Sequence, residues 1–143
     1  MKTTLVLMSA LFLIVSCGKY EKPFITFKSP EKRLLDTKWK VDKIVKADLT
    51  EETPNETLTF KVEGSDSIFI RTIDTMSYTG SWRWLPAMDG EIDKQRIVTS
   101  ISIPQVTPTQ IIYEVKVLKT KELEIIDMNS GQRGGGRYYC SKN

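Results

Sequence analysis

Cysteine is the residue type in this chain with the clearest chemical potential, and it occurs only at Cys17 and Cys140. A thiol can carry an acyl group, form a disulfide or act as a nucleophile once deprotonated. The sequence contains no histidine, which excludes Ser-His-Asp and Cys-His catalysis and removes a common zinc ligand. We therefore predict no catalytic residue, no metal site, no cofactor and no enzymatic activity, and we expect the cysteines to serve attachment or burial.

The residues before Cys17 have the pattern of an export signal. Lys2 precedes an apolar run from Leu5 to Val15, and the small Ser16 comes directly before the cysteine. A charged start, a short apolar stretch and a small residue at the cut describe a secretory signal peptide. The run is shorter than the roughly 20 residues that span a bilayer, which argues against a transmembrane anchor. A plain secretory peptide cut near Ser16, with Cys17 left as a thiol, is the second alternative.

The segment Leu13-Ile14-Val15-Ser16-Cys17 resembles the lipobox of bacterial lipoproteins. The resemblance implies that residues 1–16 are removed and that Cys17 becomes the N-terminus and carries acyl chains such as palmitate. Two or more such chains hold a protein stably on a membrane. We therefore expect a lipoprotein signal peptide at 1–16, a lipidated tether at 17–29 and one domain at 30–143. Acylation of Cys17 would leave Cys140 without a disulfide partner, as a small buried residue of a late strand.

Charge and loop motifs exclude several other classes of partner. The net charge is +3, and removal of Lys2 lowers it by one; no clustered basic face for nucleic acid stands out. The acidic loop 88–93 does not have the spacing of an EF-hand, and 127–131 has the same character of a solvated loop. The glycine-rich stretch 131–136 lacks the Lys-Ser/Thr of a P-loop, although Arg133 and Arg137 flank it and could bind an anion.

The elements needed to build the domain are almost all β-strands. A short helix is predicted near 31–36, with Ser29 as its cap, Pro30 in its first turn and Leu34 and Leu35 as apolar contacts. Beyond it, short runs alternate apolar and polar residues with period 2, which is the signal of antiparallel sheet. Each expected strand contributes apolar residues that face inward. In chain order these lie at Trp39 and Val41, Leu58 and Phe60, Ile68 and Ile70, Tyr78 to Trp84, Ile97 and Ile101, Ile111 to Val117, Leu123 and Ile125, and in 137–141.

About eight strands with short connections leave no room for crossover helices. Sequential strands this close pair as neighbours, so the sequence predicts an all-β fold, an antiparallel up-and-down meander that closes into a barrel. A barrel of this size can be filled with side chains or can hold one small ligand.

The chain is similar to the small lipocalin-like lipoproteins of Bacteroidota. The similarity rests on the lipobox and on Leu35–Val41, Glu56–Phe60, Thr79–Trp84 and Glu122–Ile125, with Asp36-Thr37 where the family usually has glycine. It implies a lipocalin-like barrel on an outer-membrane lipid anchor, and it transfers no catalytic residue. Gly18-Lys19-Tyr20-Glu21 is not an acidic run of the kind that surface-exposed lipoproteins of these bacteria carry, which implies a domain facing the periplasm. Asp66-Ser67-Ile68 and Asp74-Thr75-Met76 resemble the O-glycosylation sequon of the same bacteria.

Two functions fit this fold. In the first, Trp39, Trp82 and Trp84 line a barrel cavity of several hundred cubic ångströms that binds a small apolar ligand. In the second, the same tryptophans fill the core, and the barrel docks onto an envelope protein complex through an exposed patch. We prefer the ligand-binding hypothesis, which rests on fold analogy.

Overall fold

Antiparallel strands make up most of the structure. A computed structural model describes residues 29–90, 94–102, 109–129 and 135–143, and these contain one short helix and nine strands. The elements are α1 (Pro30–Leu34), β1 (Lys38–Lys46), β2 (Glu51–Glu52), β3 (Glu56–Glu63), β4 (Asp66–Ile73), β5 (Met76–Leu85), β6 (Arg96–Ile101), β7 (Thr109–Leu118), β8 (Glu122–Asp127) and β9 (Gly136–Lys142).

The strands form a closed up-and-down barrel. From β3 to β9 each strand pairs with the next one in the sequence, and β1 pairs with β3 on one side and with β9 on the other. Eight strands therefore close the barrel, and the two-residue β2 pairs with β1 outside this ring. The predicted fold class is confirmed. Closure gives every strand of the ring two neighbours, which removes free sheet edges.

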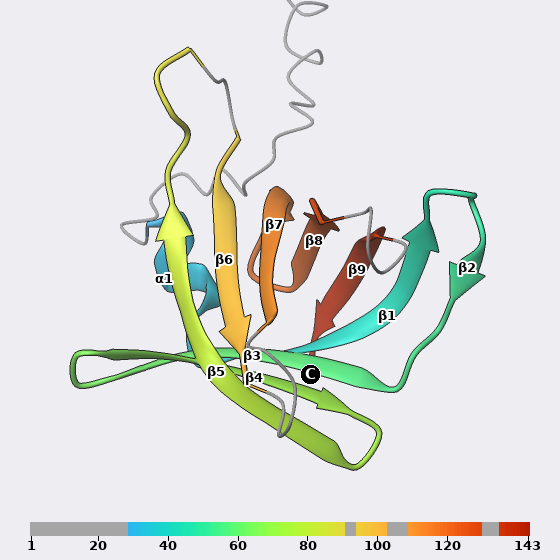
Figure 1. The fold of residues 1–143 in the computed structure, drawn as a ribbon, viewed down its shortest axis with the longest axis horizontal. Helices are drawn as coiled ribbons and strands as arrows, with labels where there is room; N and C mark the ends of the chain where they lie inside the picture. Colours follow the sequence, from blue (N-terminus) through green and yellow to red (C-terminus); the bar gives the residue numbers. More distant parts are fainter. Residues whose placement is uncertain (1–28, 91–93, 103–108, 130–134) are drawn as a thin grey trace, which may run out of the picture.

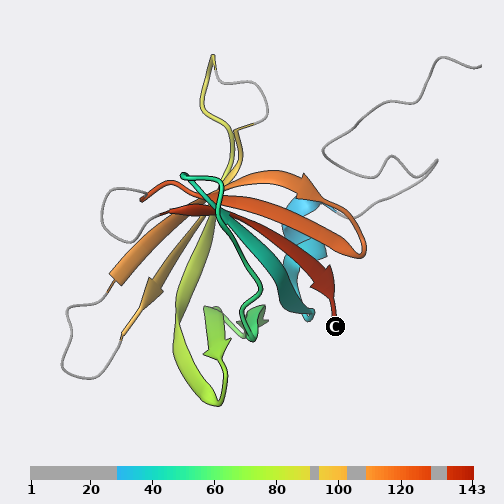
Figure 2. The ribbon, with the colours of Figure 1, turned by 90° about the vertical axis from the view of Figure 1, so that its right-hand side faces the viewer.

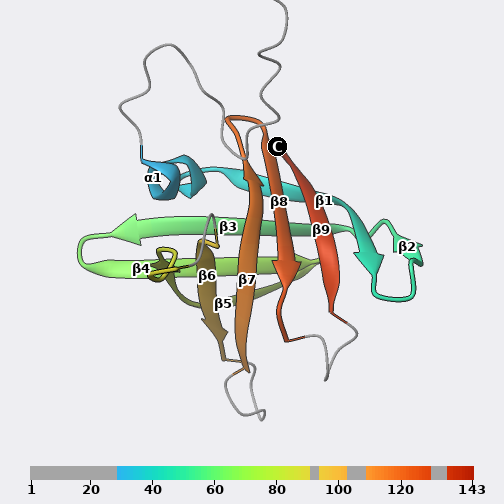
Figure 3. The same cartoon turned by 90° about the horizontal axis from the view of Figure 1, so that it is seen from above.

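The strands of the two parts of the barrel run in different directions. Strands β3 and β4 run across the direction of β7 and β8 in two views of the molecule (Figures 1 and 3). The bent strand β5 connects the two parts (Figure 2). Gly80 lies in β5 opposite Ile101 of β6, and an added Cβ there would lie 1.8 Å from the carbonyl oxygen of Ser100. The absence of a side chain at this point lets β5 and β6 approach closely.

One end of the barrel is filled with large apolar side chains. Phe60 packs against Phe69 with ring centroids 5.1 Å apart and against Trp82 edge-on at 5.6 Å. The fully buried set around them is Leu34, Trp39, Val41, Leu58, Ile97, Val115, Leu118, Leu123 and Ile125. This end is therefore a packed core, as expected if the tryptophans fill the barrel.

Helix α1 closes the filled end. Leu34 is fully buried, and its carbonyl accepts a hydrogen bond from the indole Nε1 of Trp39 at 3.3 Å. Pro30 begins the helix as predicted, whereas the Ser29 side chain forms no capping hydrogen bond. In Figure 3, α1 lies on the same side of the barrel as the β7–β8 turn and the C-terminus. Among the described residues no helix has the length and apolar character to cross a membrane.

Strand β4 differs from the expected pattern. Phe69 is the fully buried residue of this strand, while Ile68 and Ile70 are half-buried. The run Ile68-Phe69-Ile70 is apolar on both faces, so alternation alone does not identify the inner face. Val62 of β3, at the edge of the turn to β4, is exposed.

Candidate functional site

The three predicted tryptophans lie toward the filled end of the barrel. Trp39 and Trp82 are buried, and their indole groups donate hydrogen bonds to the carbonyls of Leu34 and Lys61, respectively. Trp84 is half-buried and packs against the core. The structure thus brings Trp82 and Trp84 together on the inner side of β5. None of the three is among the residues that line the cavity at the opposite end.

The two cysteines have separate positions. Cys17 and the tether 17–29 lie outside the described residues except for Ser29, so lipidation remains a prediction. Cys140 is a buried free thiol in β9, as expected. Burial raises the pKa of its thiol, and Glu56 and Asp42 add to the effect. Because the thiolate is the reactive form, the protein keeps Cys140 unreactive.

A cavity of about 310 Å³ opens at the end of the barrel opposite α1. This end is formed by the ends of β4, β6 and β8 and the beginnings of β5, β7 and β9. We call this space the mouth cavity. Its lining combines three isoleucines with polar and aromatic side chains: Ile73, Ile101, Ile111, Arg71, Tyr78, Thr109, Asp127 and Tyr138.

Arg71 carries a positive charge into the barrel and is paired there. Its Nε lies 2.8 Å from Oε1 of Glu56, a contact with the distance of an ion pair but not the angle of a hydrogen bond. A second guanidinium nitrogen donates to Oε2 of Glu56 at 3.2 Å. Burial works to lower the pKa of Arg71, but the charge of Glu56 and its hydrogen bond outweigh burial and raise the pKa overall. Arg71 is therefore charged, and Glu56 neutralises it.

Two tyrosines lie beside this pair. Tyr113 is fully buried and packs edge-on against Tyr138 at 5.8 Å between ring centroids. Burial raises the pKa of Tyr113, with Arg71 acting against this shift, and burial likewise raises the pKa of Tyr138. Both phenols are thus neutral. Within the described part of the chain the Tyr113 hydroxyl has no hydrogen-bond partner.

Asp127 is the second acid of the mouth. It ends β8 and is only 8% exposed, which corrects the prediction that 127–131 is a solvated loop, as far as 127 is concerned. One carboxylate oxygen accepts a hydrogen bond from the backbone N–H of Asn129 at 2.8 Å. The inward stripe Leu123, Ile125, Asp127 explains the burial, because residues two apart share one face of a strand.

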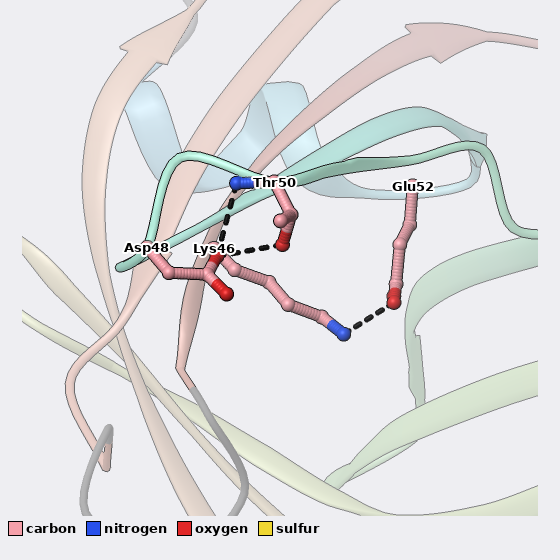
Figure 4. A network of polar contacts seen from close by, with 4 residues as sticks. All are labelled: Lys46, Asp48, Thr50 and Glu52. Atoms are coloured by element: carbon pink, nitrogen blue, oxygen red, sulfur yellow. Dashed lines mark hydrogen bonds and ion pairs between the residues drawn. The ribbon is translucent and has the colours of Figure 1, made fainter.

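A polar hairpin stands at the same end of the barrel. Lys46 forms an ion pair with Glu52, and Asp48 accepts hydrogen bonds from the Thr50 hydroxyl at 2.6 Å and from its N–H at 2.9 Å (Figure 4). These hydrogen bonds lower the pKa of Asp48. Leu49, at the tip of this turn, is 81% exposed. A groove of about 550 Å³ is lined by residues of the hairpin, of the end of β8 and of the start of β9.

A second groove lies at the opposite end, beside α1. It has a volume of about 680 Å³, and basic side chains predominate among the charged residues of its lining, which is Lys32, Arg33, Leu35, Asp36, Thr37, Thr120 and Lys142. The guanidinium of Arg33 donates to the carbonyl of Leu118 at 3.4 Å. A groove of this kind suits an acidic partner surface.

The loop motifs acquire no site in the structure. Among the described residues no group of three or more Cys, Asp or Glu side chains could hold a metal ion. Residues 91–93 of the acidic loop and Arg133 lie outside the described residues. Arg137 pairs with Glu124 at 3.4 Å. Of the two sequon residues, Thr75 is exposed in the β4–β5 turn and Ser67 is half-buried in β4.

The sequence interpretation missed Glu56, Arg71 and Asp127 because charged residues in strands are usually placed on the solvent face. A signal was present for two of them, since Glu56 precedes the apolar stripe of Leu58 and Phe60, and Asp127 follows that of Leu123 and Ile125. Arg71 had no such signal, because Ile68-Phe69-Ile70 is apolar on both faces. A charge in phase with buried residues marks an inward-facing polar group.

Comparisons with known proteins add no family. No protein-family model, no curated protein and no solved structure gives a significant match to the chain.

Proposed function

We propose that this protein is a non-enzymatic barrel that binds a small, largely apolar ligand and is held on the outer membrane by acyl chains on Cys17. The observation that carries the proposal is the mouth cavity, whose isoleucine walls and few convergent polar groups are typical of ligand sites. Its volume of about 310 Å³ lies at the lower end of the range for such sites, about 300–1,000 Å³. The ligand is therefore small.

The proposed site is the mouth cavity rather than the tryptophan cluster. Trp39 and Trp82 have their indole N–H groups satisfied by backbone carbonyls and pack in the filled end. A ligand at the mouth needs no rearrangement of that core.

Native mass spectrometry of residues 18–143, purified from the native envelope without lipid, tests ligand binding. We expect an additional mass that is released on denaturation. The variant Ile73→Trp fills the cavity and should lose this mass, whereas Ile70→Trp, on the other face of the same strand, should retain it. The proposal would be contradicted if the unmodified protein showed only the mass of its polypeptide and if no compound in a panel of small apolar molecules shifted its melting temperature.

Lipid attachment is tested separately by labelling cells with an alkyne analogue of palmitate. The full chain should incorporate the label, and Cys17→Ser should abolish it. Cys140→Ser is the matched control and should leave the label unchanged, because that thiol is buried in β9. Label retained in Cys17→Ser would show that the anchor is elsewhere. Protection of the domain from protease added to intact cells would support the periplasmic orientation.

A docking module is the second candidate, favoured by the groove beside α1. Its basic lining would accept an acidic surface of an envelope protein complex. Cross-linking in cells distinguishes the two functions. A docking module should cross-link to its partner protein through Lys32 or Lys142. Ile73→Trp, which fills the mouth cavity, should leave this cross-link unchanged.

A further inference from the structure

The charges around the mouth cavity restrict the class of ligand, if the proposed function holds. Arg71 is the basic residue of the described lining, and Glu56 already neutralises it at 2.8 Å. The Glu56 carboxylate is almost completely buried, so water cannot replace Arg71 as its partner. An anionic ligand would have to displace this partner and leave a buried carboxylate unpaired, which is costly.

Asp127 adds a negative charge that no described basic residue neutralises. It lines the cavity, and its carboxylate accepts a hydrogen bond from the backbone N–H of Asn129. The two basic residues that share the neighbouring groove with it, Lys46 and Arg137, form ion pairs with Glu52 and Glu124. Among the described residues, the mouth of the barrel therefore brings together one cation, Arg71, and two carboxylates, Glu56 and Asp127. Buried charges in proteins are normally paired, so the site has one carboxylate to offer a ligand.

Aromatic groups surround the same place. Tyr78 and Tyr138 line the cavity, and aromatic rings attract cations through their faces. Tyr113 lies opposite Asp127 in the register of β7 and β8 and packs edge-on against Tyr138, and its buried hydroxyl has no hydrogen-bond partner among the described residues. A neutral phenol oxygen can accept a hydrogen bond from an ammonium group.

We propose that the mouth cavity binds an organic amine in its ammonium form, with the charged nitrogen at Asp127 and an apolar body against Ile73, Ile101 and Ile111. The arrangement supplies one uncompensated carboxylate, two aromatic rings and apolar walls. It rejects carboxylates and phosphates because the positive charge of Arg71 is committed to Glu56. The inference deepens the proposed function and depends on it.

The test is an NMR titration of residues 18–143, which contain α1, all nine strands and every pairing that closes the barrel. The probes are hexylamine, hexanamide and hexanoate at pH 7, which share one chain length and differ in charge. We expect hexylamine to bind at least about tenfold more tightly than hexanamide. A ligand without a positive charge leaves the Asp127 carboxylate without a counter-charge, which weakens its binding. Hexanoate should bind most weakly, and shifts should be concentrated at the ends of β8 and β9 that form the mouth.

Asp127→Asn provides the matched variant. The asparagine oxygen can still accept the hydrogen bond from Asn129, so the fold is retained, and the preference for hexylamine should disappear. Glu124→Gln removes the same charge from the same strand outside the cavity and should keep the preference. Equal binding of amine and amide, tighter binding of hexanoate, or an undiminished preference in Asp127→Asn would overturn the amine assignment while the binding function stands. Failure of all three probes and of the wider panel would overturn both.

Discussion

Arg71 and Glu56 pair diagonally across two neighbouring strands on the inside of the barrel. In the register of β3 and β4, Arg71 lies opposite Leu58 and Glu56 lies opposite Ile73, and the two side chains meet at 2.8 Å. A charged pair in this position divides the interior. Aromatic and aliphatic groups fill the side toward α1, and polar groups gather on the side of the mouth.

Removal of one member of this pair should destabilise the protein strongly. Glu56→Gln leaves the Arg71 guanidinium buried without its counter-charge, and we expect a loss of about 3 kcal/mol or more in the free energy of unfolding. Urea denaturation at pH 7 measures the loss. The double variant Glu56→Leu with Arg71→Met should be more stable than either Glu56→Leu or Arg71→Met alone, since it leaves no unpaired charge. Additive losses in this cycle would show that the pair contributes no coupling.

Leu34 should be a large contributor to the stability of the closed end. Its side chain is fully buried at the base of α1, so Leu34→Ala leaves a cavity and should cost about 2–5 kcal/mol. Leu49→Ala is the matched control, because this leucine is 81% exposed, and should change stability by less than about 0.5 kcal/mol. Thermal and urea unfolding of both variants measure the difference. A similar effect for the two leucines would mean that α1 is not packed on the barrel.

Gly80 and Gly64 should respond differently to the same substitution. An alanine Cβ at Gly80 would meet the backbone of Ser100 and Ile101, which cannot move without opening the β5–β6 pairing, so Gly80→Ala should cost about 3 kcal/mol or more. Gly64 lies in a turn at φ +63° with open space around it, and Gly64→Ala should cost only about 1 kcal/mol of backbone strain. Denaturation midpoints rank the two, and an equal ranking would contradict the close approach of the strands.

Alkaline pH should destabilise the barrel through Cys140. Burial raises the pKa of this thiol in the folded state, whereas in the unfolded chain the thiol ionises at about pH 8.5. Above that pH unfolding releases a proton, so the contribution to stability is present at lower pH and is lost as the pH rises. Between pH 8 and pH 10 we expect a loss of about 2 kcal/mol. Urea denaturation of residues 18–143 follows this loss, and Cys140→Ala should reduce it by the same amount; an unchanged slope would refute the assignment.

The outline of the fold could be predicted because most strands have one apolar face. Trp39 with Val41, and Leu58 with Phe60, alternate with polar neighbours and are buried as predicted. Alternation becomes ambiguous where both faces are apolar, as at Phe69. The two-residue strand β2 carries no such pattern, since it consists of two exposed glutamates that pair with β1 because of the hairpin.

The mouth could not be derived from the sequence because it depends on the register between strands. Glu56 and Arg71 meet only when β3 and β4 are aligned as they are. Asp127 reaches the cavity because β8 and β9 place it near Tyr138. Single side chains such as these look like ordinary surface charges until the barrel is assembled, while the tryptophans, which are conspicuous in the sequence, form core.

Closure of the ring has a kinetic consequence. The β1–β9 seam joins Trp39 to Lys142 and Lys46 to Gly136, so the last strand to emerge during synthesis must find the first strand of the barrel. Pairings between residues so distant in sequence carry a large loop-closure entropy and slow folding into the millisecond-to-second range. Until the seam forms, β1 and β9 each present an open edge that can pair with another chain. The period before closure is therefore when we expect the protein to be most prone to aggregation.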